Sequence, residues 1–247
     1  MNSRDRLLNS IMGLETDRLA WSPFLAYFWD VQPEAIRKNG MLDFYKSIGA
    51  DPLFRGYCTL IKKEFKNCQI RESASNGEKQ ILYETPVGTL ESRYTYTSEG
   101  NTWFLTKHPV KTEEDYKILT FINEDMMITP DFSKYNAGSK LMGDEALLMP
   151  IIGSEMKSSF QSLLENWVGT EELTYAVYDY PEALGSCLEA MKKNSRTAAE
   201  YASRCDAEAF IFWEDSSTGN LSPAFFREYI AGEISMWVIF FTKAESI

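Results

Sequence analysis

Basic residues are scarce in this sequence of 247 residues: 25 Lys and Arg stand against 36 Asp and Glu, which gives a formal net charge of −11. A protein that wraps nucleic acid needs a basic face to neutralise the phosphates, and an anionic membrane surface makes the same demand. The charge balance therefore argues against nucleic-acid and membrane partners. It is compatible with a small-molecule substrate, because a local pocket can differ in charge from the whole surface.

Long apolar runs are also missing. No run approaches the roughly 20 residues that a membrane-spanning helix needs. The first residues, MNSRDRLLNS, lack the apolar core of a secretion signal. A cytoplasmic location is the expectation.

Metal-ligand patterns are weak. The sequence has one histidine, His108, and four cysteines, Cys58, Cys68, Cys187 and Cys205, no two of which form a CxxC pair. Structural zinc sites usually show such short pairs. We expect buried free thiols in a reducing cytoplasm. We expect His108, in a loop beside a proline, to have a structural or solvent role.

Apolar runs of strand length are present. Residues 20–28, 50–56, 147–153 and 209–215 read as buried strands, and helical periods lie between them. Buried strands that alternate with helices indicate an α/β domain with a parallel sheet. Helices are predicted over 3–13, 33–48, 160–168 and 181–205, after the N-cap Thr112, and from Pro223 after the cap Ser222.

Residues 79–106 change character. Their sequence is rich in Tyr, Thr and Val and is punctuated by the turn signals PVG and SEGN. These turns are too short to contain crossover helices. The segment is therefore predicted to be an antiparallel meander outside the parallel sheet.

The run AFIFWED ends abruptly at two acids, Glu214 and Asp215. In parallel α/β architectures the active site lies at the carboxyl ends of the strands. The run has the form of a buried strand that delivers both acids to such a site. The alternative is that the acids cap the following turn or face water.

The segment AEAFIFWEDSSTGNLSPAFFREY resembles the uroporphyrinogen decarboxylase superfamily. RDRLLNSIMGLETDRLAWSP, GMLDFYKSIGADPLFRG, YETPVGTL with HPVKTEEDY, and LLMPIIG with SFQSLLENWVG are similar to the same family and follow in the same order. The resemblance covers nearly the whole chain to about Trp237. It implies one domain over 1–247, an α/β fold of the (β/α)8 barrel type with the 79–106 meander as an insertion. It also implies an aromatic, acid-lined cleft at the carboxyl ends of the strands.

Two motifs of true porphyrinogen decarboxylases are replaced in this sequence. Their arginine-bearing loop, which holds substrate carboxylates, corresponds to FLAYFWDVQPE, which has no arginine. Their catalytic aspartate corresponds to Phe54-Arg55-Gly56. The pattern is typical of a branch related to corrinoid-linked methyltransferases, which implies methyl transfer between a corrinoid protein and a thiol or small methylated compound. The alternatives are a uroporphyrinogen decarboxylase and a chain that is not an enzyme.

The residues predicted for the site are Glu214 and Asp215 as catalytic groups, and Tyr27, Trp29, Asp51 and Arg55 as substrate-binding groups. Tyr27 and Trp29 could stack on a flat tetrapyrrole-like cofactor or belong to the core. Arg55 follows a strand end and could hold a carboxylate or phosphate. Pairing with a nearby acid such as Asp51 is the alternative.

The chain looks truncated at its C-terminus, since four buried strands are expected outside the meander and a closed barrel needs eight. The zinc-binding histidine and cysteines of the methyltransferase branch belong to later strands. Zinc is therefore expected in a full-length parent, with the corrinoid on a partner protein. This chain is expected to retain no cofactor and to transfer methyl groups at a rate near background. Bare strand edges and apolar faces also suggest pairing of two copies as a homodimer.

Overall fold

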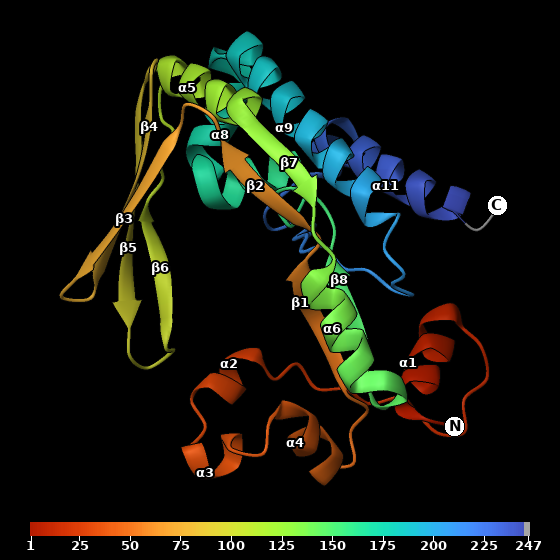
Figure 1. The fold of residues 1–247 in the computed structure, drawn as a ribbon. Helices are drawn as coiled ribbons and strands as arrows, with labels where there is room; N and C mark the ends of the chain where they lie inside the picture. Colours follow the sequence, from red (N-terminus) through yellow and green to blue (C-terminus); the bar gives the residue numbers. More distant parts are fainter. Residues whose placement is uncertain (245–247) are drawn as a thin grey trace.

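A parallel pair of strands lies at the centre of the computed structural model, which describes residues 1–244. It consists of β1 (Leu53–Thr59) and β8 (Leu147–Ile151). A second pair, β2 (Ile61–Phe65) and β7 (Met126–Pro130), is antiparallel. Within the described residues the strands close into no barrel, and the architecture is mixed α/β (Figure 1).

The third sheet is wholly antiparallel and contains the predicted meander. Its strands neighbour one another in chain order: β3 (Gln69–Ser75), β4 (Glu78–Thr85), β5 (Gly88–Thr97) and β6 (Thr102–Lys107). The antiparallel excursion predicted over 79–106 is confirmed, and β3 extends it toward the N-terminus. In Figure 1 one end of this sheet meets α5 and the other end projects away from the helices.

Helices surround the strands. Those before β1 are α1 (Ser3–Met12), α2 (Ala26–Asp30), α3 (Glu34–Arg37) and α4 (Met41–Ser47). Those between β6 and β8 are α5 (Glu113–Asp125), α6 (Ser133–Met142) and the 3-10 turn η1 (Gly143–Glu145). Those after β8 are α7 (Ser159–Ser162), the π-helical η2 (Leu163–Trp167), α8 (Thr170–Asp179), α9 (Pro181–Ala202), α10 (Pro223–Phe225), the π-helical η3 (Phe226–Ile230) and α11 (Ala231–Ala244).

Two predicted elements before β1 are wrong. Residues 20–28 form no strand, and they pass instead through an irregular segment into α2. Pro23 cannot donate to a ladder, and Phe24 remains 52% exposed rather than packing between layers. The helix predicted over 33–48 is broken into α3 and α4 at Gly40, whose φ of 86° is left-handed.

The largest group of buried side chains lies between the antiparallel sheet and helices α5, α7, α8 and α9. Tyr83 of β4 packs on Trp167 of η2, with 5.1 Å between the ring centroids. Helix α5 begins as predicted, with a capping box in which the Thr112 hydroxyl accepts from the Asp115 N–H at 3.3 Å. This core fixes the start of α7, where the candidate site lies. Across residues 1–244, every helix is too short or too polar to span a bilayer.

Candidate functional site

The run AFIFWED lies beside the carboxyl end of β8. The Ile211 N–H donates to the Pro150 carbonyl at 3.0 Å, and the Ile152 N–H donates to the Ile211 carbonyl at 2.9 Å. Ile211 also forms a parallel bridge with Ile151. Ile211 therefore pairs in parallel with β8, but the buried strand predicted over 209–215 is not formed, since residues 209–214 are half-buried and Asp215 is exposed. The run forms one bridge rather than a full strand, because the chain after Ile152 turns away into a loop.

Glu214, at the end of this run, is held by Ser158. The Ser158 N–H donates to Glu214 Oε2 at 2.9 Å, and the Ser158 hydroxyl donates to Oε1 at 2.7 Å. Burial raises the pKa of Glu214, hydrogen bonds from Ser158 oppose the rise, and the charges of Glu233 and Glu165 add to it. The carboxyl group therefore keeps its proton to a higher pH than an ordinary glutamate does.

A second carboxylate is held by the next residue along the chain. Glu233 of α11 accepts from the Ser159 N–H at 2.9 Å and from the Ser159 hydroxyl at 3.1 Å. Burial raises the pKa of Glu233, while hydrogen bonds from Ser195 and Ser159 and the charge of Lys192 oppose the rise. Two consecutive serines thus bring two carboxyl groups from different elements to the start of α7.

Two further acids lie nearby and are paired with lysines. Lys157 forms an ion pair with Glu165, and Gln161 Nε2 donates to Glu165 Oε1 at 2.5 Å. Lys63 of β2 reaches Glu155 at 2.8 Å. Both lysines therefore already form an ion pair with a carboxylate of the protein. We call the whole group the serine–carboxylate cluster: Lys63, Glu155, Lys157, Ser158, Ser159, Gln161, Glu165, Glu214 and Glu233.

The side chain of Asp215 has different partners from that of the adjacent Glu214. It is exposed, accepts from the Ser217 N–H at 3.2 Å, and accepts from the Asn220 side chain. The Ser217 hydrogen bonds lower the pKa of Asp215. Asp215 thus caps the turn that follows it, the alternative that the sequence left open, and the structure shows no contact between it and the serine–carboxylate cluster in the described residues.

Asp51 is fully buried and belongs to an ion-pair group of its own. Its Oδ1 accepts from Arg6 at 2.5 Å and from Arg18 at 2.8 Å. Arg55 pairs with neither this acid nor the cluster. It donates to the Ser22 carbonyl at 3.0 Å. The suggested pair between Asp51 and Arg55 is wrong, because α1 and the segment after it supply closer guanidinium groups.

The guanidinium of Arg55 nevertheless lies near the end of AFIFWED. It stacks over the Phe24 ring at 5.8 Å from the centroid, and Phe24 lies 6.0 Å from Trp213, the residue before Glu214. Gly56 allows the approach, since a Cβ there would lie 3.0 Å from the Trp213 ring. The middle of β1 and the end of AFIFWED therefore meet through an aromatic contact, and Arg55 lies within the strand rather than after its end.

The two predicted aromatic residues lie in α2. Tyr27 is 66% exposed, and Trp29 packs beside Leu25 and Phe44, with 5.7 Å between the Trp29 and Phe44 centroids. Trp29 therefore belongs to a small core of the N-terminal segment. The structure brings neither of them into contact with Glu214 among the described residues.

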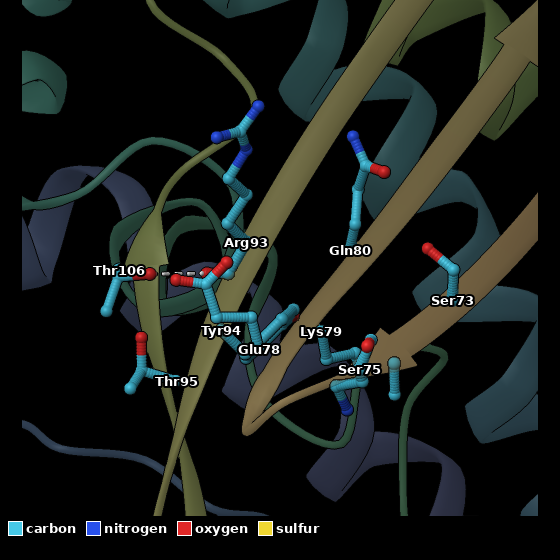
Figure 2. A pocket seen from close by; sticks show the side chains of 10 residues that line it. Ser73, Ser75, Glu78, Lys79, Gln80, Arg93, Tyr94, Thr95 and Thr106 are labelled. Atoms are coloured by element: carbon cyan, nitrogen blue, oxygen red, sulfur yellow. Dashed lines mark hydrogen bonds between the residues drawn. The ribbon is translucent and has the colours of Figure 1, made fainter.

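A hollow of about 300 Å³ lies on one face of the antiparallel sheet. Figure 2 shows its lining of polar side chains, among them Ser73, Gln80, Arg93 and Thr106. Two of the lining side chains already bind within the sheet, since Arg93 and Gln80 both donate to Glu91 at 2.6 Å. The hollow therefore offers less chemistry than the serine–carboxylate cluster.

Zinc does not fit the described residues. The four cysteines are free and buried, as expected for structural thiols, and burial raises the pKa of Cys58 and Cys187. A thiol with a raised pKa is a poor source of the thiolate that zinc binds. No group of three or more Cys, His, Asp or Glu in the described part of the chain could hold a metal ion. His108 instead packs on Gly169, and its Nε2 lies 3.2 Å from the Glu165 carbonyl.

Sequence reasoning found Glu214 but missed its partners. The segment GSEMKSSFQS, which follows β8, supplies Ser158, Ser159 and Gln161 and carries a usable signal. Serines directly before an apolar helical period mark a cap, and here the cap lies after a buried strand. Glu233 had no such signal, because it reads as one acid among the apolar residues of α11.

The comparison with known proteins assigns no role to the residues of the serine–carboxylate cluster. No family model matches the chain, and no curated protein matches it significantly. The functional proposal therefore depends on the serine–carboxylate cluster and on the resemblance described above.

Proposed function

We propose that the chain belongs to a cytoplasmic enzyme of the uroporphyrinogen decarboxylase superfamily, with its (β/α)8 barrel, that moves a methyl group from a small methylated compound to a corrinoid protein. The observation that carries this proposal is the partly buried Glu214 carboxyl, held by two hydrogen bonds from Ser158 at the end of a parallel segment. Such a group can act as a general acid, because its raised pKa lets it keep a proton to a higher pH than an ordinary glutamate does.

The chemistry assigned to Glu214 is protonation of the leaving atom. When a methyl–oxygen or methyl–nitrogen bond breaks, its electron pair stays on the oxygen or nitrogen. The proton of Glu214 goes to that atom, and the methyl group goes to the acceptor. Glu214 is left as a carboxylate that accepts both Ser158 hydrogen bonds. Those bonds favour the ionised form and so stabilise the charge that develops.

The charges of the cluster favour this reaction over decarboxylation of a porphyrinogen. Four glutamates face two lysines, and both lysines are already in ion pairs. A substrate that carries several carboxylates would be repelled, whereas a neutral or cationic methyl donor would not. Activation of a thiol by zinc would need a set of ligands that the described residues do not offer, so a small methylated compound is the proposed methyl donor.

The test is a methyl-transfer assay on this chain and on any longer form that its gene encodes. Cob(I)alamin would serve as the acceptor, with methylated amines, ethers and thioethers as donors, and methylcobalamin would be followed by absorbance. Glu214→Gln should lower the rate by about 10²–10⁴-fold, the usual contribution of a general acid. Asp215→Asn is the matched control and should leave the rate unchanged.

Other outcomes would favour the alternatives. Conversion of uroporphyrinogen to coproporphyrinogen would place decarboxylation first. An unchanged rate in Glu214→Gln would remove Glu214 from the reaction. A folded protein that transfers no methyl group in any form would support the third possibility, in which the acids only join α7 to its neighbours.

A further inference from the structure

Two of the four acids in the serine–carboxylate cluster, Glu214 and Glu233, are joined through the single peptide unit between Ser158 and Ser159. Ser158 gives its N–H and hydroxyl to Glu214, and Ser159 gives the same two groups to Glu233, at distances between 2.7 and 3.1 Å. Any shift of one serine therefore moves the donors of the other. The methyl-transfer proposal uses only the first of these two pairs.

Glu233 is placed too deeply to meet a substrate. It is 4% exposed, and Ser159 is 1% exposed. Behind it, Ser195 of α9 accepts from Trp237 Nε1 at 3.0 Å and also hydrogen-bonds Glu233. A carboxyl enclosed by protein donors in this way has no free side for a reacting atom, yet its charge lies close to Glu214.

We propose that Glu233 is a positioning residue for the candidate site: through Ser159 it fixes the backbone from which Ser158 holds Glu214, and it places a second carboxyl group beside that acid. The inference rests on the proposed function and extends it, because it names Glu233 as the residue that positions the proposed acid, Glu214. Its test measures the titration of Glu214 and needs no substrate.

Burial is the largest influence on the pKa of Glu233 and raises it. Donors from Ser159 and Ser195 and the charge of Lys192 on α9 oppose the rise and favour the carboxylate form. Glu214 faces Glu165 of η2, whose own partner is Lys157. The remaining charged groups near Glu233 line a groove of about 400 Å³ between α9 and α11: Glu189, Lys193, Arg196 and Glu228. An ionised Glu233 repels a second negative charge on Glu214.

The experiment is an NMR titration of side-chain carboxyl carbons in the whole chain. In Glu233→Gln the like charge is removed while the amide keeps a similar shape. The titration midpoint of Glu214 should fall, because the charge of Glu233 contributes to its raised pKa. Glu233→Asp keeps the charge but shortens the reach to Ser159. It should restore much of the midpoint, while amide exchange at Ser159 becomes faster. Asp215→Asn is the control and should not move the midpoint.

A second variant keeps the test decisive if Glu233→Gln does not fold. Ser159→Ala removes the hydroxyl that donates to Glu233 Oε1 and leaves the N–H that donates to Oε2. Amide exchange at Ser158 should become faster, because Glu233 then holds this backbone through one hydrogen bond instead of two. An unchanged Glu214 midpoint in Glu233→Gln, or unchanged exchange at Ser158 in Ser159→Ala, would overturn the inference. Failure of the methyl-transfer assay alone would refute the proposed reaction and leave this titration result standing.

Discussion

At the scale of single residues, Asp51 was predicted to bind substrate, but its carboxylate instead forms ion pairs inside the protein. It is 0% exposed and pairs with Arg6, which is 6% exposed, and with Arg18. Asp51→Asn should lower the free energy of unfolding by roughly 3 kcal/mol, because it leaves a buried guanidinium partly uncompensated. Urea unfolding at pH 7 would measure the loss.

The control for this prediction is an exposed ion pair. Lys117 of α5 reaches Glu114 at 3.1 Å, and both side chains are more than half exposed. Lys117→Ala should lower the free energy of unfolding far less than Asp51→Asn does, because solvent screens an exposed ion pair. If the two substitutions lowered the free energy of unfolding equally, burial would add nothing to the contribution of the Asp51 ion pairs.

The candidate site was only partly predictable at this scale. Glu214 was found because a polar residue that ends an apolar run is a local signal in one segment. Its relation to Ser158 and Glu233 joins three segments that are far apart in the chain. No spacing rule connects such residues, so the cluster had to be seen in the fold. Asp215 has the same local signal as Glu214, and only the turn geometry separates their roles.

At the scale of elements, α6 packs on β1 through a glycine. A Cβ at Gly138 would overlap the ring and hydroxyl of Tyr57, which stacks under Lys134 and against Phe54. Gly138→Ala should therefore destabilise the protein by about 1–3 kcal/mol, even though alanine is the better helix former. Thermal unfolding would measure the change.

The control lies in α9, where a Cβ at Gly185 would meet nothing within 4 Å. Gly185→Ala should stabilise by about 0.5–1 kcal/mol through helix propensity alone. If Gly138→Ala also stabilised the protein, the close packing of α6 on β1 would be wrong.

Elements with strong local patterns were predictable from the sequence. The apolar run of β8 and the turn-punctuated strands β4 to β6 were confirmed. Residues 20–28 were mistaken for a strand, because an aromatic run looks the same whether it is buried in a sheet or lies partly exposed in a loop. β2 was missed, because its sequence IKKEF is polar and its partner β7 follows only after the whole antiparallel sheet.

At the scale of the whole molecule, two sets of acids should give stability a maximum at mildly acidic pH. Hydrogen bonds lower the pKa of Glu91, through Lys107, Arg93 and Gln80, and of Asp131, through Ser133, each to about 2. Their contribution is present above the unfolded pKa near 4 and is lost as the pH falls toward 2. Burial raises the pKa of Glu214 and Glu233. Their contribution is present below the unfolded pKa and is lost as the pH rises through the folded one.

The unfolding temperature should therefore rise as the pH is lowered from 7 toward the unfolded carboxyl pKa near 4, and should fall as the pH is lowered further toward about 2. Calorimetry across this range would measure it. The variant with both Glu214→Gln and Glu233→Gln should lose the rise above about pH 4 and keep the fall in acid. A wild-type unfolding temperature that decreases steadily from pH 7 downward would contradict this prediction.

The pairing of β1 with β8 has a consequence for synthesis on the ribosome. Leu53 and Leu147 are paired, yet the whole antiparallel sheet, α5 and α6 lie between them in the chain. The hairpins of β3 to β6 close over short loops and can form as soon as they emerge, whereas distant strands must first overcome the entropy of a long loop. A nascent chain therefore carries β1 with an open edge until β8 leaves the exit tunnel. Throughout that interval, β1 is the segment most in need of a chaperone.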